Sequence, residues 1–177
     1  MKLFGKTTSN QAIFTTMATV VSVCALGVSL MQTYYQHKYL HAAAWPHLQL
    51  TTNRYEDKDS TKCVTTVKLM NKGVGPAILE SVSYQYKGKK IDDIDTLVQS
   101  VVGKKFGGSY KSIVEGDVIA QNEGFDLISI IGVKARVFSE NIIYIKIRIV
   151  YSSVHDQKWE YLYDPELPNG SITKKLN

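Results

Sequence analysis

The longest run of hydrophobic positions covers residues 12–31, where twenty consecutive residues include no charged residue, proline, asparagine or glutamine. A helix of this length, rising ~1.5 Å per residue, spans the ~30 Å hydrocarbon core of a bilayer. We therefore predict a transmembrane helix over residues 12–33, preceded by an N-terminal tail of residues 1–11. No small-x-small cleavage site follows closely, which favours a retained anchor over a cleaved signal peptide.

From residue 47 onward, apolar and polar residues alternate, which predicts β-strands. The expected strands begin or run at 48–50, 63–69, 78–86, 125–131, 142–151 and 158–163, with polar turns between them. In the strand 142–151 we expect Ile143 on the same face as Ile145, Ile147 and Ile149. Short strands at this spacing predict a mainly β domain, an antiparallel sandwich over residues 47–167, followed by a C-terminal tail of residues 168–177.

One segment departs from this alternation. Residues 92–103 carry acidic residues first, apolar residues at a period of 3.6, and then Gly103. Acidic side chains suit the positive end of a helix dipole and glycine suits its end, so we predict one short inserted helix here. The Gly107-Gly108 segment after it is expected to be a mobile loop.

Between the membrane and the domain, residues 34–46 predict a juxtamembrane helical stalk that Pro46 ends. Tyr34, Tyr35 and Tyr39 suit the headgroup interface. His37 and His41 have the spacing of a two-histidine metal site, but no carboxylate or cysteine lies nearby to complete it. We therefore expect neither a metal nor another cofactor.

Within the predicted transmembrane helix, small and polar residues recur at alternating steps of three and four. These residues are Thr15, Ala18, Ser22, Ala25, Ser29 and Gln32. Small residues let helices approach closely in lipid, which predicts a helix–helix interface with another membrane protein or with a second copy. The alternative is that such residues are simply common in membrane helices.

The distribution of charge bears on orientation and on partners. Lys2 and Lys6 precede the apolar run and only Lys38 follows it closely, which favours a cytoplasmic N-terminus and a periplasmic or extracellular domain. The net charge is +5, but 18 Lys/Arg and 16 Asp/Glu fall on the domain side, which leaves the domain at +2. This mixed surface argues against a nucleic-acid partner.

The segment Asn71-Lys72-Gly73-Val74-Gly75-Pro76-Ala77 is the most specific motif in the domain. We interpret it as a structural turn in which Asn71, Gly73, Gly75 and Pro76 matter, with glycines permitting positive φ and proline directing the chain into the next strand. The motif resembles that of uncharacterised small bacterial single-pass membrane proteins. This resemblance implies an immunoglobulin-like β-sandwich exodomain, although the late hairpin carries His155-Asp156 where that group has Asp and Gly.

No catalytic motif is recognisable, so we expect no enzymatic activity. The sequence favours a non-enzymatic interaction or structural subunit of a membrane or envelope complex, whose sandwich binds a partner protein. Trp159, Tyr161 and Tyr163 share a strand face and form a possible partner surface, with burial in the core as the alternative. A different hypothesis is a small-ligand or stress sensor, in envelope maintenance or phage defence, with the 107–108 loop as a movable lid.

Overall fold

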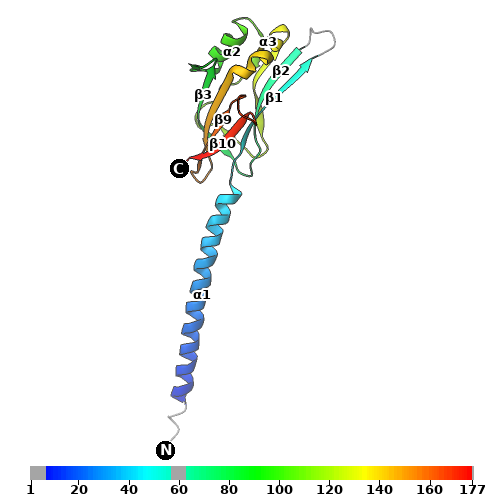
Figure 1. The fold of residues 1–177 in the computed structure, drawn as a ribbon. Coiled ribbons are helices and arrows are strands. Elements are labelled where there is room, and N and C mark those ends of the chain that lie inside the picture. Colours follow the sequence, from blue (N-terminus) through cyan, green and yellow to red (C-terminus); the bar gives the residue numbers. More distant parts are fainter. Residues whose placement is uncertain (1–6, 57–62, 177) are drawn as a thin grey trace, which may run out of the picture. The chain divides into compact units, whose positions relative to one another are not determined.

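The chain was analysed as a computed structural model, which describes residues 7–56 and 63–176. Its contacts divide it into two units, Met1–Ala42 and Ala43–Asn177. Figure 1 shows a long helix in the first and a β-rich domain in the second. Each unit is described separately below.

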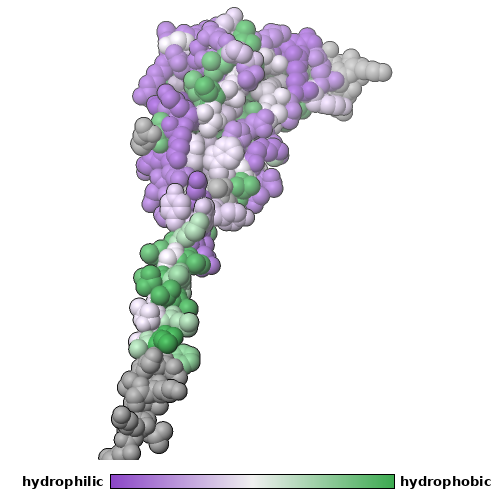
Figure 2. Space-filling view, turned by 60° about the horizontal axis from the view of Figure 1, so that its bottom comes forward, coloured by the Kyte–Doolittle hydropathy of each residue, from purple (hydrophilic) through white to green (hydrophobic). Residues whose placement is uncertain are grey.

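The first unit consists of helix α1 (Thr7–Ala43). Residues Gln11–Leu40 are long and apolar enough to cross a membrane. The most apolar window of 18 residues within them has a mean hydropathy of 2.0, and none of that window is buried. On the face drawn in Figure 2, hydrophobic side chains gather on this helix, while the domain surface is mostly hydrophilic. The helix continues beyond residue 33, where the predicted membrane span ends, and stops at Ala43, three residues before Pro46.

The domain contains two antiparallel sheets, which we call sheet A and sheet B. Sheet A has the strand order β1 (Leu48–Glu56), β2 (Cys63–Asn71), β7 (Gly124–Ile131), β5 (Gly107–Tyr110). Sheet B has the order β10 (Ser171–Leu176), β9 (Lys158–Tyr163), β8 (Ile145–Ser152), β3 (Ala77–Tyr86), β4 (Lys89–Ile91), and β6 (Val118–Ile119) also pairs with β3. The prediction of a mainly β, antiparallel domain is therefore confirmed.

The alternation of residues explains which face of each sheet is buried. Along β2, every second residue from Cys63 to Asn71 is buried, and the residues between them are half-buried. On β8, Ile145, Ile147 and Ile149 face the same core, as the period-two pattern predicts. One hydrophobic cluster joins side chains of both sheets and of two helices.

Two short helices lie at one end of the domain (Figure 1). Helix α2 (Ile94–Val102) confirms the predicted inserted helix: the Asp93 carboxylate accepts a hydrogen bond from the backbone N–H of Thr96 at 2.6 Å, and Gly103 follows the last helical residue with a φ of 85°. Helix α3 (Val133–Asn141) was not predicted, so the expectation of a single inserted helix was incomplete. Its buried face is small, since Ala135 and Phe138 are its two buried residues. The hydrophobic periodicity of this segment is therefore too weak to predict a helix from the sequence.

The boundaries differ from prediction at four places. Residues 142–144 form a 3₁₀ turn, η1 (Ile142–Tyr144), so Ile143 is exposed instead of facing the core. Strand β1 continues to Glu56 through part of an expected polar turn, and the rest of that turn falls within the undescribed residues 57–62. The expected mobile loop contains β5, and the expected C-terminal tail contains β10. Both pair with a neighbouring strand, and such pairing cannot be read from local composition.

The two sheets make different contacts along their length. Near the beginning of β1 they meet directly, because the backbone N–H of Leu50 donates to the Tyr161 hydroxyl at 2.9 Å. Toward the other end, α3 packs on β2 and β7, while α2 packs on β3 and β4, and the two helices contact each other. Helices thus pack on the two sheets at one end, and an aromatic side chain joins the sheets at the other.

Candidate functional site

The turn after β2 is held together by the side chain of Asn71. Its carbonyl oxygen accepts hydrogen bonds from the backbone N–H groups of His47 at 3.1 Å and Gly73 at 3.0 Å. Its amide group donates to the carbonyl oxygens of Gly75 at 2.8 Å and Ile119 at 3.0 Å. Asn71 is completely buried, so this one side chain joins three separate stretches of backbone.

The turn also binds the first residues of the domain through its backbone. The N–H of Lys72 donates to the carbonyl oxygen of His47 at 2.7 Å, and the N–H of Val74 donates to that of Trp45 at 2.9 Å. The motif Asn71–Ala77 therefore holds the segment that contains Trp45 and His47 in a defined position.

The two glycines of this turn serve a different purpose from the one expected. Neither Gly73 nor Gly75 has a positive φ. A Cβ atom at Gly73 would lie 2.4 Å from the carbonyl oxygen of Trp45, and one at Gly75 would lie 2.5 Å from that of Ala44. These glycines are required because the backbone of residues 44–47 passes too closely for any side chain.

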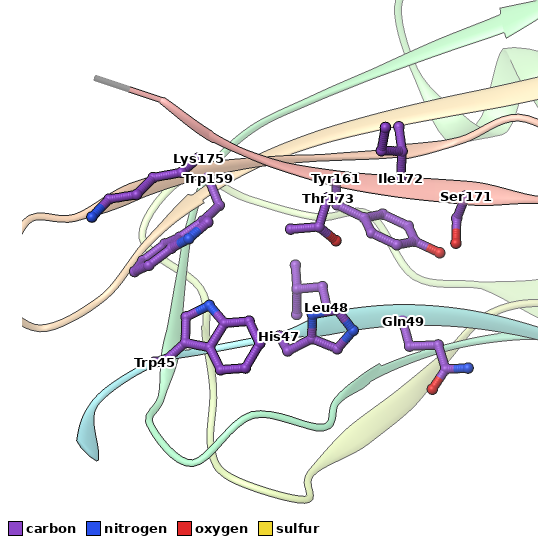
Figure 3. A pocket seen from close by; sticks show the side chains of 10 residues that line it. All are labelled: Trp45, His47, Leu48, Gln49, Trp159, Tyr161, Ser171, Ile172, Thr173 and Lys175. Carbon is purple, nitrogen blue, oxygen red and sulfur yellow. The ribbon is translucent and has the colours of Figure 1, made fainter. Parts of the chain in front are cut away.

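Beside this segment, a pocket of about 620 Å³ opens between the edge strands β1 and β10. Ten residues line it: Trp45, His47, Leu48, Gln49, Trp159, Tyr161, Ser171, Ile172, Thr173 and Lys175. In Figure 3, the indole rings of Trp45 and Trp159 lie on two sides of the same gap, and Thr173 lies across from His47. The sequence alone predicts Trp45 as part of the stalk and indicates no role for the residues of β10.

The aromatic residues of β9 are positioned by this packing. Trp159 is 5% exposed and stacks on Tyr151, with their ring centroids 5.9 Å apart. Tyr161 is also buried and Tyr163 is half-buried, so these three residues do not form an exposed aromatic row for a partner. Burial of Tyr151 raises the pKa of its hydroxyl to about 12, since the phenolate would be poorly solvated there.

On the outer side of sheet A, the strand register brings together a surface that no single segment of sequence reveals. Tyr55, Val64, Ile131 and Gly107 are directly opposite one another across the sheet. The next row is Asn53, Thr66, Ser129 and Ser109. We call these eight residues the uncharged face; each is at least partly exposed, and Tyr55 and Ile131 are 66% and 53% exposed.

The predicted seam of α1 lies wholly within the helix. Thr15 and Ser22 donate their hydroxyl groups to the carbonyl oxygens of Gln11 and Ala18 at 2.9 and 2.8 Å, which satisfies both groups without water. All six seam residues are exposed, and the helix–helix interface stays a prediction.

Charged residues of the domain pair with one another. A hydrogen bond from Arg136 holds the pKa of the Glu56 carboxyl below its usual value, and Arg148 has the same effect on Glu160.

Within residues 7–56 and 63–176, no three His, Cys, Asp or Glu side chains come close enough to hold a metal ion. Cys63 is buried and has no disulfide partner among these residues.

Comparisons with protein-family models, with curated proteins and with solved structures found no match to this chain.

Proposed function

We propose that this protein is a membrane-anchored, non-enzymatic interaction subunit whose β domain binds a partner protein. Helix α1 crosses the membrane once in this proposal, with the N-terminus in the cytoplasm and the domain outside. The observation that carries the proposal is the uncharged face, which extends across all four strands of sheet A.

The composition of this face suits a protein partner. Interface cores are depleted of charged residues, whereas a solvated surface normally intersperses charges of both signs. The outer face of sheet B provides the contrast, because Arg148 and Glu160 pair across it. On the uncharged face, serine and threonine replace such pairs, and Tyr55 and Ile131 add apolar area.

The edge of sheet A next to this face offers a second attachment. Among the described strands, β5 pairs with β7 alone, and all four of its residues are exposed. Gly107 and Ser109 present little bulk, so an incoming strand can approach the backbone of β5. A partner could therefore cover the uncharged face and extend the sheet at the same edge.

The helix supplies the other part of the proposal. Its apolar surface has no partner within the described chain, and the small residues of its seam allow another helix to approach closely. We assign the seam to association in the membrane and the uncharged face to association outside it.

The test is to extract the full chain from its native membrane in mild detergent, measure the mass of the particle, and identify its components. Ser129→Arg places a charge at the centre of the uncharged face, while Ser81→Arg, on the exposed outer side of sheet B, is the matched control. We expect a defined complex that Ser129→Arg dissociates and Ser81→Arg leaves intact. A single-chain particle in the wild type, or a complex indifferent to Ser129→Arg, would refute the proposal.

The seam is tested in parallel by replacing Ala18, Ser22 and Ala25 together with leucine. If this variant loses a membrane-embedded component and Ser129→Arg loses a component with an exposed domain, the two assignments are separated. Loss of neither component by the leucine variant would remove the seam from the proposal.

A further inference from the structure

The pocket between β1 and β10 has features that a partner surface does not require. The alternation of β10 is reversed relative to its hydrophobicity. Thr173 and Lys175 share a face with the buried Tyr161 and Trp159 of β9, while Ile172, which also borders the pocket, is 53% exposed. Thr173 and Lys175 stand opposite Tyr161 and Trp159 in the strand register. A slip of one residue would turn Ile172 and Leu176 inward, so the fold presents polar groups where the sequence offers apolar ones. Such a conflict between local pattern and structure is typical of functional sites.

One polar group of the pocket is buried without a partner. The Nδ1 atom of His47 is inaccessible and has no hydrogen bond in the described part of the chain. Buried nitrogen atoms are normally paired, and an unpaired one destabilises the fold. A rotation of the imidazole ring about χ2 would exchange Nδ1 with Cδ2 and bring the nitrogen to the pocket, where a ligand hydroxyl would satisfy it.

The position of this histidine is fixed in advance. The backbone of His47 is held by Asn71 and Lys72, and that of Trp45 by Val74. Trp45 and His47 also contact each other, with ring centroids 5.5 Å apart. Side chains placed in this way lose little freedom on binding, which favours a ligand of modest size.

The chemistry of the lining indicates the class of ligand. The volume of about 620 Å³ falls within the ~300–1,000 Å³ of small-molecule sites. No Asp or Glu lines it, so nothing there would neutralise a cation. A purely apolar ligand would cover the hydroxyl groups of Ser171 and Thr173 without offering them a hydrogen bond. The lining suits a neutral molecule that has one apolar face and a rim of hydroxyl groups.

A pyranose sugar has this shape. Its axial C–H bonds carry a small positive charge and can lie against the negative face of an indole ring, while its equatorial hydroxyls point outward to hydrogen-bonding groups. In Figure 3, the two indoles and the hydroxyl of Thr173 surround the same space. We propose that this pocket binds a hexopyranose unit of a glycan, stacked on the half-exposed indole of Trp45, next to the largely buried Trp159, and hydrogen-bonded by Thr173 and His47.

The chain offers a direct readout, because its two tryptophans both line this pocket. The full-length protein in nanodiscs would be titrated with cellotetraose, maltotetraose and chitotetraose while tryptophan emission is recorded. We expect a saturable change with at least one of the three sugars at millimolar concentration or below. No saturable change with any of the three would overturn the proposal.

Variants then locate the binding. Trp45 is 47% exposed, so Trp45→Ala should leave the fold intact while weakening binding at least tenfold, with Trp159 as the remaining reporter. Thr173→Val removes a hydroxyl at nearly constant volume and should weaken binding several-fold. Tyr55→Ala, on the uncharged face, is the control and should change nothing. Unaltered binding by both pocket variants would overturn the proposal. A change in tryptophan emission with inorganic phosphate that equals the change with sugar, and that Lys175→Ala abolishes, would also overturn it, because the pocket would then be an anion site.

Discussion

Replacement of Asn71 by alanine should destabilise the domain more than the loss of any exposed polar side chain. The substitution removes four hydrogen bonds from one buried position. It leaves two backbone N–H groups, on His47 and Gly73, and two carbonyl groups, on Gly75 and Ile119, without these partners. A buried group left unpaired costs about 1–3 kcal/mol, and partial relaxation of the turn reduces the sum.

We therefore expect the free energy of unfolding to fall by about 4 kcal/mol. This is a large fraction of the ~5–15 kcal/mol typical of a folded domain. For a domain of this size it corresponds to a decrease in melting temperature of at least about 10 °C. Asn53→Ala, on an exposed part of β1, is the control and should change stability by about 0.5 kcal/mol or less.

The measurement is chemical denaturation of the full chain in detergent micelles, followed by near-ultraviolet circular dichroism, which reports the packing of the domain's aromatic residues. Asn71→Asp provides a sharper version of the same test, because it keeps the shape of the side chain and an oxygen that can accept both backbone hydrogen bonds. It loses both donors and turns a charge toward two carbonyl oxygens, so at neutral pH it should be at least as unstable as the alanine variant. Protonation of the new carboxyl group at low pH restores one donor, so its deficit relative to wild type should shrink on acidification. An alanine variant within 1 kcal/mol of wild type would refute the role given to this side chain.

Three further predictions concern stability and use the same measurement. Gly73→Ala should lower the free energy of unfolding by several kcal/mol, because its Cβ would lie 2.4 Å from backbone atoms. Gly88 has open space around it and a φ of 79°, so Gly88→Ala should cost only about 1 kcal/mol. Equal costs would contradict the argument that the backbone approaches Gly73 closely. Tyr84→Phe should stabilise the domain by about 1 kcal/mol, because the buried Tyr84 hydroxyl has no hydrogen-bond partner among the described residues; a loss of stability would show that this hydroxyl is paired. Between pH 10 and 12, the free energy of unfolding should fall by up to about 1.4 kcal/mol per pH unit through Tyr151 alone. The reason is that the pKa of Tyr151 is about 12 in the folded chain and near 10.0 in the unfolded chain, so only the unfolded chain releases the proton in this range. Tyr151→Phe should flatten this part of the profile, and an unchanged slope would refute the assignment.

Much of the architecture follows from local pattern. The uncharged run of residues 12–31 identifies a helix long enough to span a membrane, because helix length and side-chain polarity are properties of consecutive residues. The alternation in β2 and β8 identifies both the strands and their buried faces for the same reason. Helix α2 is marked by its own acidic start and its glycine end.

The elements that were missed depend on distant neighbours. Strand β10 exists because it pairs with β9, although its own hydrophobic alternation favours the opposite face. Helix α3 is held by packing on β2 and by a hydrogen bond from the Thr65 hydroxyl to the carbonyl oxygen of Ala135 at 2.9 Å, seventy residues away in the chain. Local propensity is a weak guide when tertiary contacts supply most of the stabilisation.

The pocket and the uncharged face likewise depend partly on local sequence and partly on distant contacts. The sequence by itself determined that the Asn71–Ala77 motif is a structural turn and that the chain carries an apolar helix followed by a β domain, since these depend on residue types at fixed short spacing. Only the tertiary structure decided that this turn positions Trp45 and His47, that Trp159 faces them from a strand more than a hundred residues later, and that eight uncharged residues of four strands form one surface. The physical reason is that register and sheet order are set by the sum of many long-range contacts, which no short window of sequence contains.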